Sequence, residues 1–327
     1  MKKILFIILA SSVSFLSYSQ SITATTILNE DINQAGKLIE AYFTPMTKSF
    51  GLGLNNGWYN TAKPHSLGGF DLTFTVNTVI IPKSAKTFNI QDAGGNIFVS
   101  NETKASTIFG NNDGTEMTYY PGGNSGMINP QFGFIGGEFN MPGGFNTSIV
   151  PIPIIQAGVG LVKKTDLSVR YMPMLNIGNN INVNVFGIGL RHDLLQWIPI
   201  VGDAFPMSLS LQGGYTNLNT EVKVSGQKTS LNTKTTTINL IASRKILMIT
   251  GYAGIGYSST STTFTTDAKF DLGGLEFDEK LSIDFESNNK FRANLGVRFN
   301  ITLLTIQADY TIAEYHTASL GLGVSLR

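Results

Sequence analysis

The stretch 304–312 reads LTIQADYTI, and an apolar residue stands at every second position. This period of two places apolar side chains on one face of a strand and polar ones on the other. The stretch 291–299, FRANLGVRF, has the same period, and only Asn300, Ile301 and Thr302 separate the two. The pair therefore predicts an antiparallel hairpin with one apolar face and one polar face.

Ten segments between residues 68 and 326 share this alternation, and each runs for about 10–13 residues. Soluble strands usually have about 5–6 residues, whereas a tilted strand that crosses a membrane needs about 9–11. The length of the segments therefore predicts an all-β fold, an antiparallel transmembrane β-barrel over residues 58–327. We expect about 12 strands, with 10 or 14 as alternatives, because the stretch 82–150 could add two spanning strands or an outer hairpin.

The composition excludes several other classes. Of the 327 residues 42% are hydrophobic and 14% are charged, against about 25% charged in ordinary soluble domains. The 23 Lys and Arg balance 22 Asp and Glu, so no nucleic-acid partner is expected. The chain has no Cys, which excludes disulfides and Cys-ligated metals. A mean hydropathy of +0.08 argues against a helical membrane protein.

The first residues have the pattern of an export signal. Lys2 and Lys3 precede an apolar run over 4–15, and small residues at Ser17 and Ser19 predict cleavage after Ser19. Residues 1–19 are therefore predicted to be a cleaved signal peptide. Together with the barrel pattern, this predicts the outer membrane of a Gram-negative bacterium, with membrane lipid as a partner.

Residues 20–57 are predicted to form a separate N-terminal segment. Apolar residues at helical spacing predict a short amphipathic helix over about 29–43, capped by Asn29 and ended by Pro45. Its apolar face would dock at the periplasmic mouth or in the lumen of the barrel. The alternative is an ordinary N-terminal helix on a soluble domain.

The connections fall into two groups. Tight turns at 163–165, 243–245 and 300–302 alternate with long polar connections at about 82–150, 219–233 and 259–289. Outer-membrane barrels have short periplasmic turns and long external loops, so this sorting predicts which end faces outward. The apolar link 192–205 predicts a short interfacial helix stopped by Pro199, and 262–272 with 275–286 predicts a projecting hairpin.

The alternation assigns a set of polar side chains to the lumen. The candidates are Asp71, Gln156, Arg170, Gln212, Asn239, Tyr252, Arg292, Arg298, Gln307 and Asp309. One interpretation is a structural network, with Arg292 or Arg298 paired to Asp309 in a filled, closed barrel. The other is a positively lined path for a carboxylate or another anion. Inward-facing glycines could make room for the N-terminal helix as a plug, or for an apolar ligand.

The sequence offers little for catalysis. The expected topology places His65 and His192 near the periplasmic rim and His316 near the outer end, so the three cannot share a metal ion. We therefore expect no enzyme activity, no catalytic residues, no cofactor and no metal site.

Several motifs carry a resemblance to a known family. The stretch 57–65, GWYNTAKPH, with 151–157, PIPIIQA, and 189–193, GLRHD, resembles an uncharacterised family of outer-membrane β-barrel proteins of Gram-negative bacteria, a domain of unknown function. The layout is more distantly similar to the long-chain fatty-acid outer-membrane transporter family. That family's N-terminal Asn-Pro-Ala motif is absent, with 60–64 (NTAKP) in its place.

These observations lead to a functional hypothesis. We expect a porin-like protein for passive passage of small hydrophobic or amphipathic molecules, with a hydrophobic or anionic small-molecule ligand. The alternatives are a structural or surface-binding barrel without transport, and a soluble secreted β-protein. A barrel enzyme is the remaining alternative.

Overall fold

The computed structural model describes residues 29–120, 137–177, 181–198, 206–224, 227–272, 275–287 and 291–326. The predicted signal peptide, 1–19, lies outside the described residues. In the part of the chain that is described, no helix has both the length and the apolar content that crossing a membrane requires.

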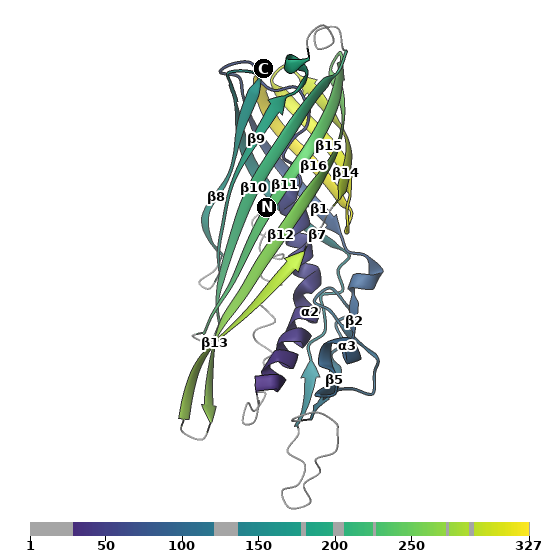
Figure 1. Ribbon diagram of the computed structural model, residues 1–327, viewed down its shortest axis with the longest axis vertical. Helices are drawn as coiled ribbons and strands as arrows, with labels where there is room; N and C mark the ends of the chain where they lie inside the picture. The colour runs from purple at the N-terminus through teal and green to yellow at the C-terminus, as the bar shows by residue number, and fades with distance from the viewer. Residues whose placement is uncertain are drawn as a thin grey trace, which may run out of the picture.

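Ten antiparallel strands close into a barrel in the described part of the chain (Figure 1). They are β1 (Phe70–Ile80), β7 (Ile149–Leu161), β8 (Thr165–Ile177), β9 (Ile181–Asp193), β10 (Ser208–Val224), β11 (Gln227–Ile246), β12 (Ile249–Leu272), β14 (Arg292–Ile301), β15 (Leu304–Ile312) and β16 (Thr317–Leu326). Pairing of β1 with β16 and of β11 with β12 closes the ring. The predicted barrel is confirmed. Its described strands number ten, which was one of the alternatives to the expected 12.

The two ends of the barrel differ in the way that the connections predicted, but two expected connections are wrong. Residues 219–233 belong mostly to β10 and β11, which stay paired up to Val224↔Gln227, and 243–245 lie within β11. We call one end of the barrel the turn end: it carries the tight turns at 162–164, 247–248 and 302–303, the start of β1 and the end of β16. Lys163, Lys164, Leu247 and Thr302 adopt positive φ there, between 46° and 54°, as tight hairpin turns require. The opposite end, the loop end, carries the long connection 81–148.

The outer surface of the barrel is apolar. Along β1, Phe70, Leu72 and Phe74 are exposed while Asp71 and Thr73 between them are buried. The other strands continue this band, in which Leu295 of β14 is 71% exposed and Leu320 of β16 is 67% exposed. Soluble monomers rarely expose contiguous apolar patches above a few hundred Å². A closed barrel with an apolar exterior and a polar interior is the arrangement of a membrane-spanning β-barrel.

The connection 81–148 does not add strands to the barrel, which explains why the count is ten and not twelve. Its described part forms two small sheets and two short helices beyond the loop end: η2 (Lys83–Ala85), β2 (Thr87–Asn89), α3 (Ile90–Gly94), β3 (Phe98–Val99), β4 (Lys104–Ser106), β5 (Thr115–Tyr119) and β6 (Gly137–Met141). We call this unit the loop-end domain. Ile90, Phe98, Ile108 and Met117 are buried in its core.

The predicted hairpin at the loop end is present. β13 (Leu275–Ser287) pairs with the outer half of β12, from Thr260↔Ser287 to Leu272↔Leu275, while the inner half of β12 pairs with β14. The hairpin projects past the barrel wall (Figure 1). The interfacial helix expected over 192–205 is only the 3-10 turn η3 (Leu195–Trp197), and 199–205 lie outside the described residues.

Helix α2 (Asn29–Asn55) is longer than the sequence predicted, because it continues through Pro45 instead of ending near residue 43. An interior proline costs about 3 kcal/mol or more. Packing on both sides of Pro45 offsets this cost: Leu38 and Tyr42 join the core of the loop-end domain, and Leu52 and Leu54 are buried farther along the helix. The Tyr42 hydroxyl also ties the helix to the loop-end domain, because it donates to the Gly143 carbonyl at 2.9 Å. Burial raises the pKa of this hydroxyl, so it stays protonated and keeps donating.

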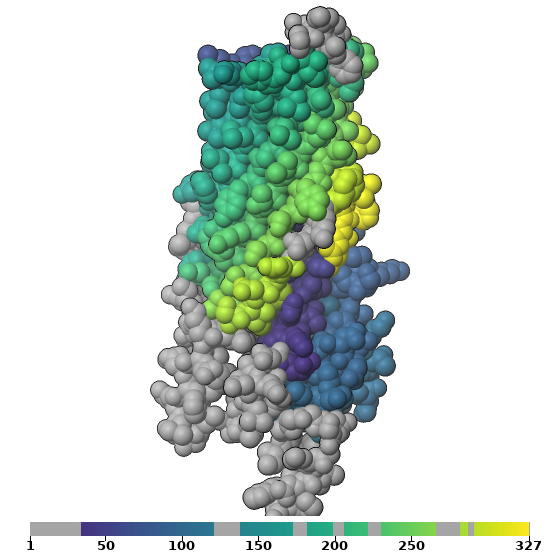
Figure 2. All heavy atoms as spheres, viewed as in Figure 1, coloured from purple at the N-terminus to yellow at the C-terminus, as the bar shows by residue number. Residues whose placement is uncertain are grey.

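The helix therefore links the outside of the barrel to its interior. It contacts β1, β7, β10, β11, β12 and β13 as well as α3. In Figure 2 its purple surface emerges at the loop end beside the blue loop-end domain. The last turns of the helix lie in the lumen, whereas its first half packs on the loop-end domain outside the barrel.

Candidate functional site

The interior of the barrel is occupied by the chain itself. From the last turns of α2, residues 51–66 run through the barrel toward the turn end, where β1 begins (Figure 1). We call residues 51–66 the lumen segment. Every residue from 51 to 62 is buried except the half-buried Gly57. The candidate site is therefore the contact between this segment and the inner face of the wall.

Side chains of the wall bind the backbone of the lumen segment along most of its length. Its carbonyls accept hydrogen bonds as follows: Gly53 from Asn77, Leu54 and Asn56 from Arg170, Asn55 from Arg292, Trp58 from Gln156, Thr61 from Arg191 and Ala62 from Ser210. Its amides also pair, Ala62 with Ser243 at 2.9 Å and His65 with Asp166 at 2.8 Å. The wall thus satisfies buried backbone groups that have no secondary-structure partner.

Two buried arginines cap the end of helix α2. Arg170, from β8, donates to the Leu54 carbonyl at 2.5 Å and to the Asn56 carbonyl at 2.7 Å. Arg292, from β14, donates to the Asn55 carbonyl at 2.6 Å. The last carbonyls of a helix lack intrahelical donors and carry partial negative charge. The last turn of α2 contains no basic residue of its own, so the barrel supplies both cations.

Two aromatic residues of the lumen segment fit against glycines of the wall. A Cβ added to Gly189 or to Gly214 would lie 2.6 Å or 2.5 Å from the Trp58 ring. The other face of that ring carries the Arg170 guanidinium, 3.6 Å from the ring centroid, a cation–π contact. Gly254 lies under the Tyr59 hydroxyl in the same way. These inward glycines therefore make room for the lumen segment.

A charged cluster holds the lumen segment near the turn end. Buried His65 places Nδ1 3.1 Å from the Asp166 carboxylate and Nε2 3.4 Å from the Asp71 carboxylate. Arg191 pairs with the same Asp166 and donates to the Thr61 carbonyl at 2.8 Å. A buried charge is stable only when it is paired and hydrogen-bonded, and this cluster meets that requirement.

The structure places all ten predicted lumen residues on the inner face. Six of them contact the lumen segment: Asp71 contacts His65, Gln156 and Arg170 contact Trp58, Arg292 binds the end of helix α2, and Arg298 and Gln307 bind Asn60. The other four pair with one another: Gln212 accepts from Asn239, and Tyr252 donates to Asp309. One expected contact is wrong. In the described residues no ion pair joins Asp309 to Arg292 or Arg298. Arg292 and Arg298 each bond to the lumen segment, and Tyr252 and Asn294 donate to Asp309.

Sequence reasoning missed the partner of this wall. Asn56, Trp58 and Asn60 lie before the first alternating segment, so no period marked them as lumen residues. Asp166 was missed because it follows the tight turn, although it shares the inward face with Arg170. The available signal was the number of inward-facing glycines, because the space beside them must be occupied by another part of the chain or by a ligand.

The histidines lie where the topology predicted. His65 is at the turn end, and His192 there pairs with Thr165 at 2.8 Å and with Trp197 at 2.8 Å. His316 lies at the loop end, where its carbonyl accepts from Ile80. Among the described residues, no group of three or more His, Asp or Glu side chains could hold a metal ion.

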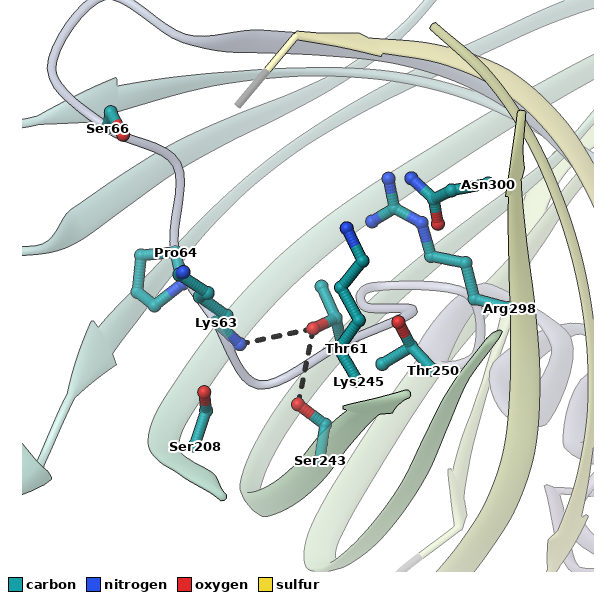
Figure 3. Close-up of a pocket in the computed structure, with 10 residues that line it drawn as sticks. All are labelled: Thr61, Lys63, Pro64, Ser66, Ser208, Ser243, Lys245, Thr250, Arg298 and Asn300. Atoms are coloured by element: carbon teal, nitrogen blue, oxygen red, sulfur yellow. Dashed lines mark hydrogen bonds between the residues drawn. The ribbon is translucent and has the colours of Figure 1, made fainter. Parts of the chain in front are cut away.

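A cavity of about 280 Å³ opens at the turn end between the lumen segment and the wall (Figure 3). The lumen segment contributes Thr61, Lys63, Pro64 and Ser66, and the strands contribute Ser208, Ser243, Lys245, Thr250, Arg298 and Asn300. The cavity is the part of the site that a small molecule could reach without displacing the segment.

These features define a class: a transmembrane β-barrel whose lumen is filled by its own N-terminal chain. The protein belongs to the family of unknown function DUF6588, whose profile matches residues 1–326. A search of curated proteins finds no match. The first of the two resemblances is thus confirmed, and the distant similarity to fatty-acid transporters stays a hypothesis.

Solved barrels resemble the chain at low identity. The translocator domain of autotransporter NalP from Neisseria meningitidis has 10% identity, covers 94% of this chain and 100% of its own, and has a TM-score of 0.29. The outer-membrane protease OmpT from Escherichia coli has 8% identity, with 79% and 97% covered and a TM-score of 0.33. Neisserial surface protein A has 10% identity, with 79% and 96% covered and a TM-score of 0.25. At such scores no function is transferred.

Proposed function

We propose that this protein resides in the outer membrane of a Gram-negative bacterium and passes small amphipathic molecules through a lumen that its own segment 51–66 closes. One observation carries the proposal: wall side chains hold the segment mainly by hydrogen bonds to its backbone. The predicted signal peptide and the apolar exterior support the location.

A hydrogen-bonded contact suits a removable closure. The bonds from neutral wall side chains contribute about 0.5–1.5 kcal/mol each, and those from Arg170, Arg191 and Arg292 about 1.5–3 kcal/mol each, because water can replace either partner. The four wall arginines Arg170, Arg191, Arg292 and Arg298 would become wet when the segment leaves, which lowers the cost of holding charge in the lumen.

The same wall favours an amphipathic acid over a purely hydrophobic molecule. Four arginines face the lumen in the described part of the wall, together with the carboxylates of Asp71, Asp166, Asp193 and Asp309. Threonine, serine, asparagine and glutamine fill most of the remaining inward positions, for example Thr73, Thr75, Gln212 and Asn239. A carboxylate headgroup would find donors along this path, whereas a hydrocarbon would not.

A disulfide lock tests the proposal directly. The natural chain has no Cys, and Thr61 Oγ1 of the segment lies 3.2 Å from Ser243 Oγ of β11. The double variant Thr61→Cys with Ser243→Cys should therefore tether the segment to the wall when oxidised. Octanoate uptake and ion conductance in lipid vesicles should be low when it is oxidised and recover after reduction.

The two single Cys variants serve as controls, because neither can form the tether, so oxidation should change the uptake of neither. Uptake that is unchanged by oxidation of the double variant would refute closure by this segment. Absence of uptake in every reduced sample would refute passage. Toluene as a second probe separates an amphipathic from a purely hydrophobic preference.

A second function has its own support. The loop-end domain lies outside the barrel, and its buried side chains Ile90, Phe98 and Ile108 pack in one cluster with helix α2 and the loop-end part of the wall. Such a unit fits a surface-binding role without transport. If this is the function, proteases added to intact cells should cleave the loop-end domain while the locked and unlocked barrels show equal, negligible uptake.

A further inference from the structure

The cavity at the turn end has the chemistry of an anion site. Lys63, Lys245 and Arg298 line it together with the hydroxyls of Ser208 and Thr250, and its described lining includes no carboxylate. Figure 3 shows the Lys245 ammonium and the Arg298 guanidinium close together on one side, with Lys63 across from them. Three cations around one opening attract a negatively charged molecule.

Arg298 gives the site a built donor. The residue is 2% exposed, and its Nη1 donates to Asn60 Oδ1 at 2.7 Å. Its Nε and Nη2 have no hydrogen-bond partner among the described residues. Buried guanidinium donors are normally paired, because burying an unpaired donor is unfavourable. Both nitrogens are buried in this structure, so an oxyanion would accept from them in a bidentate contact once the Arg298 side chain turns toward the cavity.

We propose that this cavity binds a small oxyanion, such as phosphate or a short carboxylate, between Arg298, Lys63 and Lys245. The cavity lies at the turn end and is lined by none of the apolar side chains of the outer face, so its occupant comes from solution on the turn side. A phospholipid headgroup offers the same phosphate chemistry but would have to leave the lipid layer to enter.

The ligand would touch two parts of the molecule at once. Thr61, Lys63 and Ser66 belong to the lumen segment, and Ser243, Lys245 and Arg298 belong to the wall. A ligand that bridges them binds only the closed arrangement and therefore stabilises it. This consequence rests on the proposed function, whereas the binding itself does not.

The test is a phosphate titration of the full-length protein in lipid-free detergent micelles, followed by calorimetry at constant ionic strength. Lys63→Gln with Lys245→Gln should weaken phosphate binding about tenfold or more, because two charge-assisted contacts are lost. The matched control is Arg244→Gln, since Arg244 precedes Lys245 on β11, is exposed, and does not line the cavity. That control should stay within about twofold of the natural protein.

Three results would overturn the assignment: no phosphate binding by the natural protein, equal loss in Arg244→Gln, or no loss in the double variant. The titration is repeated in nanodiscs of anionic phospholipid. If free phosphate binds in micelles but not in nanodiscs, the headgroup is the occupant and the soluble oxyanion is refuted. None of these readouts measures uptake, so their failure is separate from failure of the transport proposal.

Discussion

A substitution at Gly214 tests how the lumen segment packs on the wall, because alanine adds a single carbon atom facing Trp58. In Gly214→Ala, the new Cβ would lie 2.5 Å from Trp58 Cε2 and 2.8 Å from Nε1, where ordinary contacts begin at 3.4 Å. Trp58 is buried between this glycine and Arg170 and cannot turn away. Overpacking of this kind costs about 1–3 kcal/mol, so the free energy of unfolding should fall by that amount.

The neighbouring glycine is the control. Gly213 lies on the same strand but faces outward, and a Cβ there meets nothing within 4 Å. Gly213→Ala should stabilise by about 0.4–1 kcal/mol, so the two variants should differ by roughly 1.5–4 kcal/mol. Urea unfolding in micelles, followed by far-ultraviolet circular dichroism, measures both. Equal effects at the two glycines, or failure of Trp58→Ala to relieve the Gly214→Ala loss, would refute this packing.

Three further changes probe the wall. Arg170→Met leaves the Leu54 and Asn56 carbonyls without donors at about 1–3 kcal/mol each, and hydrogen exchange of amides 54–58 should accelerate; unchanged exchange contradicts the cap. Leu295→Arg, on the exposed outer face, should cost about 2–4 kcal/mol near the bilayer midplane, measured by unfolding in vesicles. Asn294→Arg should also destabilise, by about 1–3 kcal/mol, because Asn294 is buried in a filled lumen; full tolerance would indicate a water-filled one.

The period-two pattern was enough to predict the wall and the facing of its side chains. At Asp309, for example, the alternation correctly separated the inward carboxylate from the outward Ile306 and Tyr310. The register between neighbouring strands was harder to predict, because a shift of two residues leaves every side chain on the same face of the sheet. Asn294 pairs across from Thr311, and it reaches Asp309 diagonally.

The contents of the barrel could not be predicted in the same way. A segment bound by wall side chains needs no period of its own, so residues 51–66 resemble an ordinary loop in the sequence. Pro45 indicated a helix end because local propensity does not include the packing of Leu38 and Leu54 on either side of it. The loop-end domain was likewise hidden, since its strands are only 2–5 residues long.

Amide hydrogen exchange of residues 51–66, measured on the full-length protein in membranes, tests most directly whether the chain fills its own barrel. Wall side chains hold the carbonyls of this segment and the amides of Ala62 and His65 in a buried site. Protection of Ala62 and His65 comparable to that of strands β1 and β16 is the predicted result. Exchange at these two amides as fast as at exposed Leu67 would contradict it.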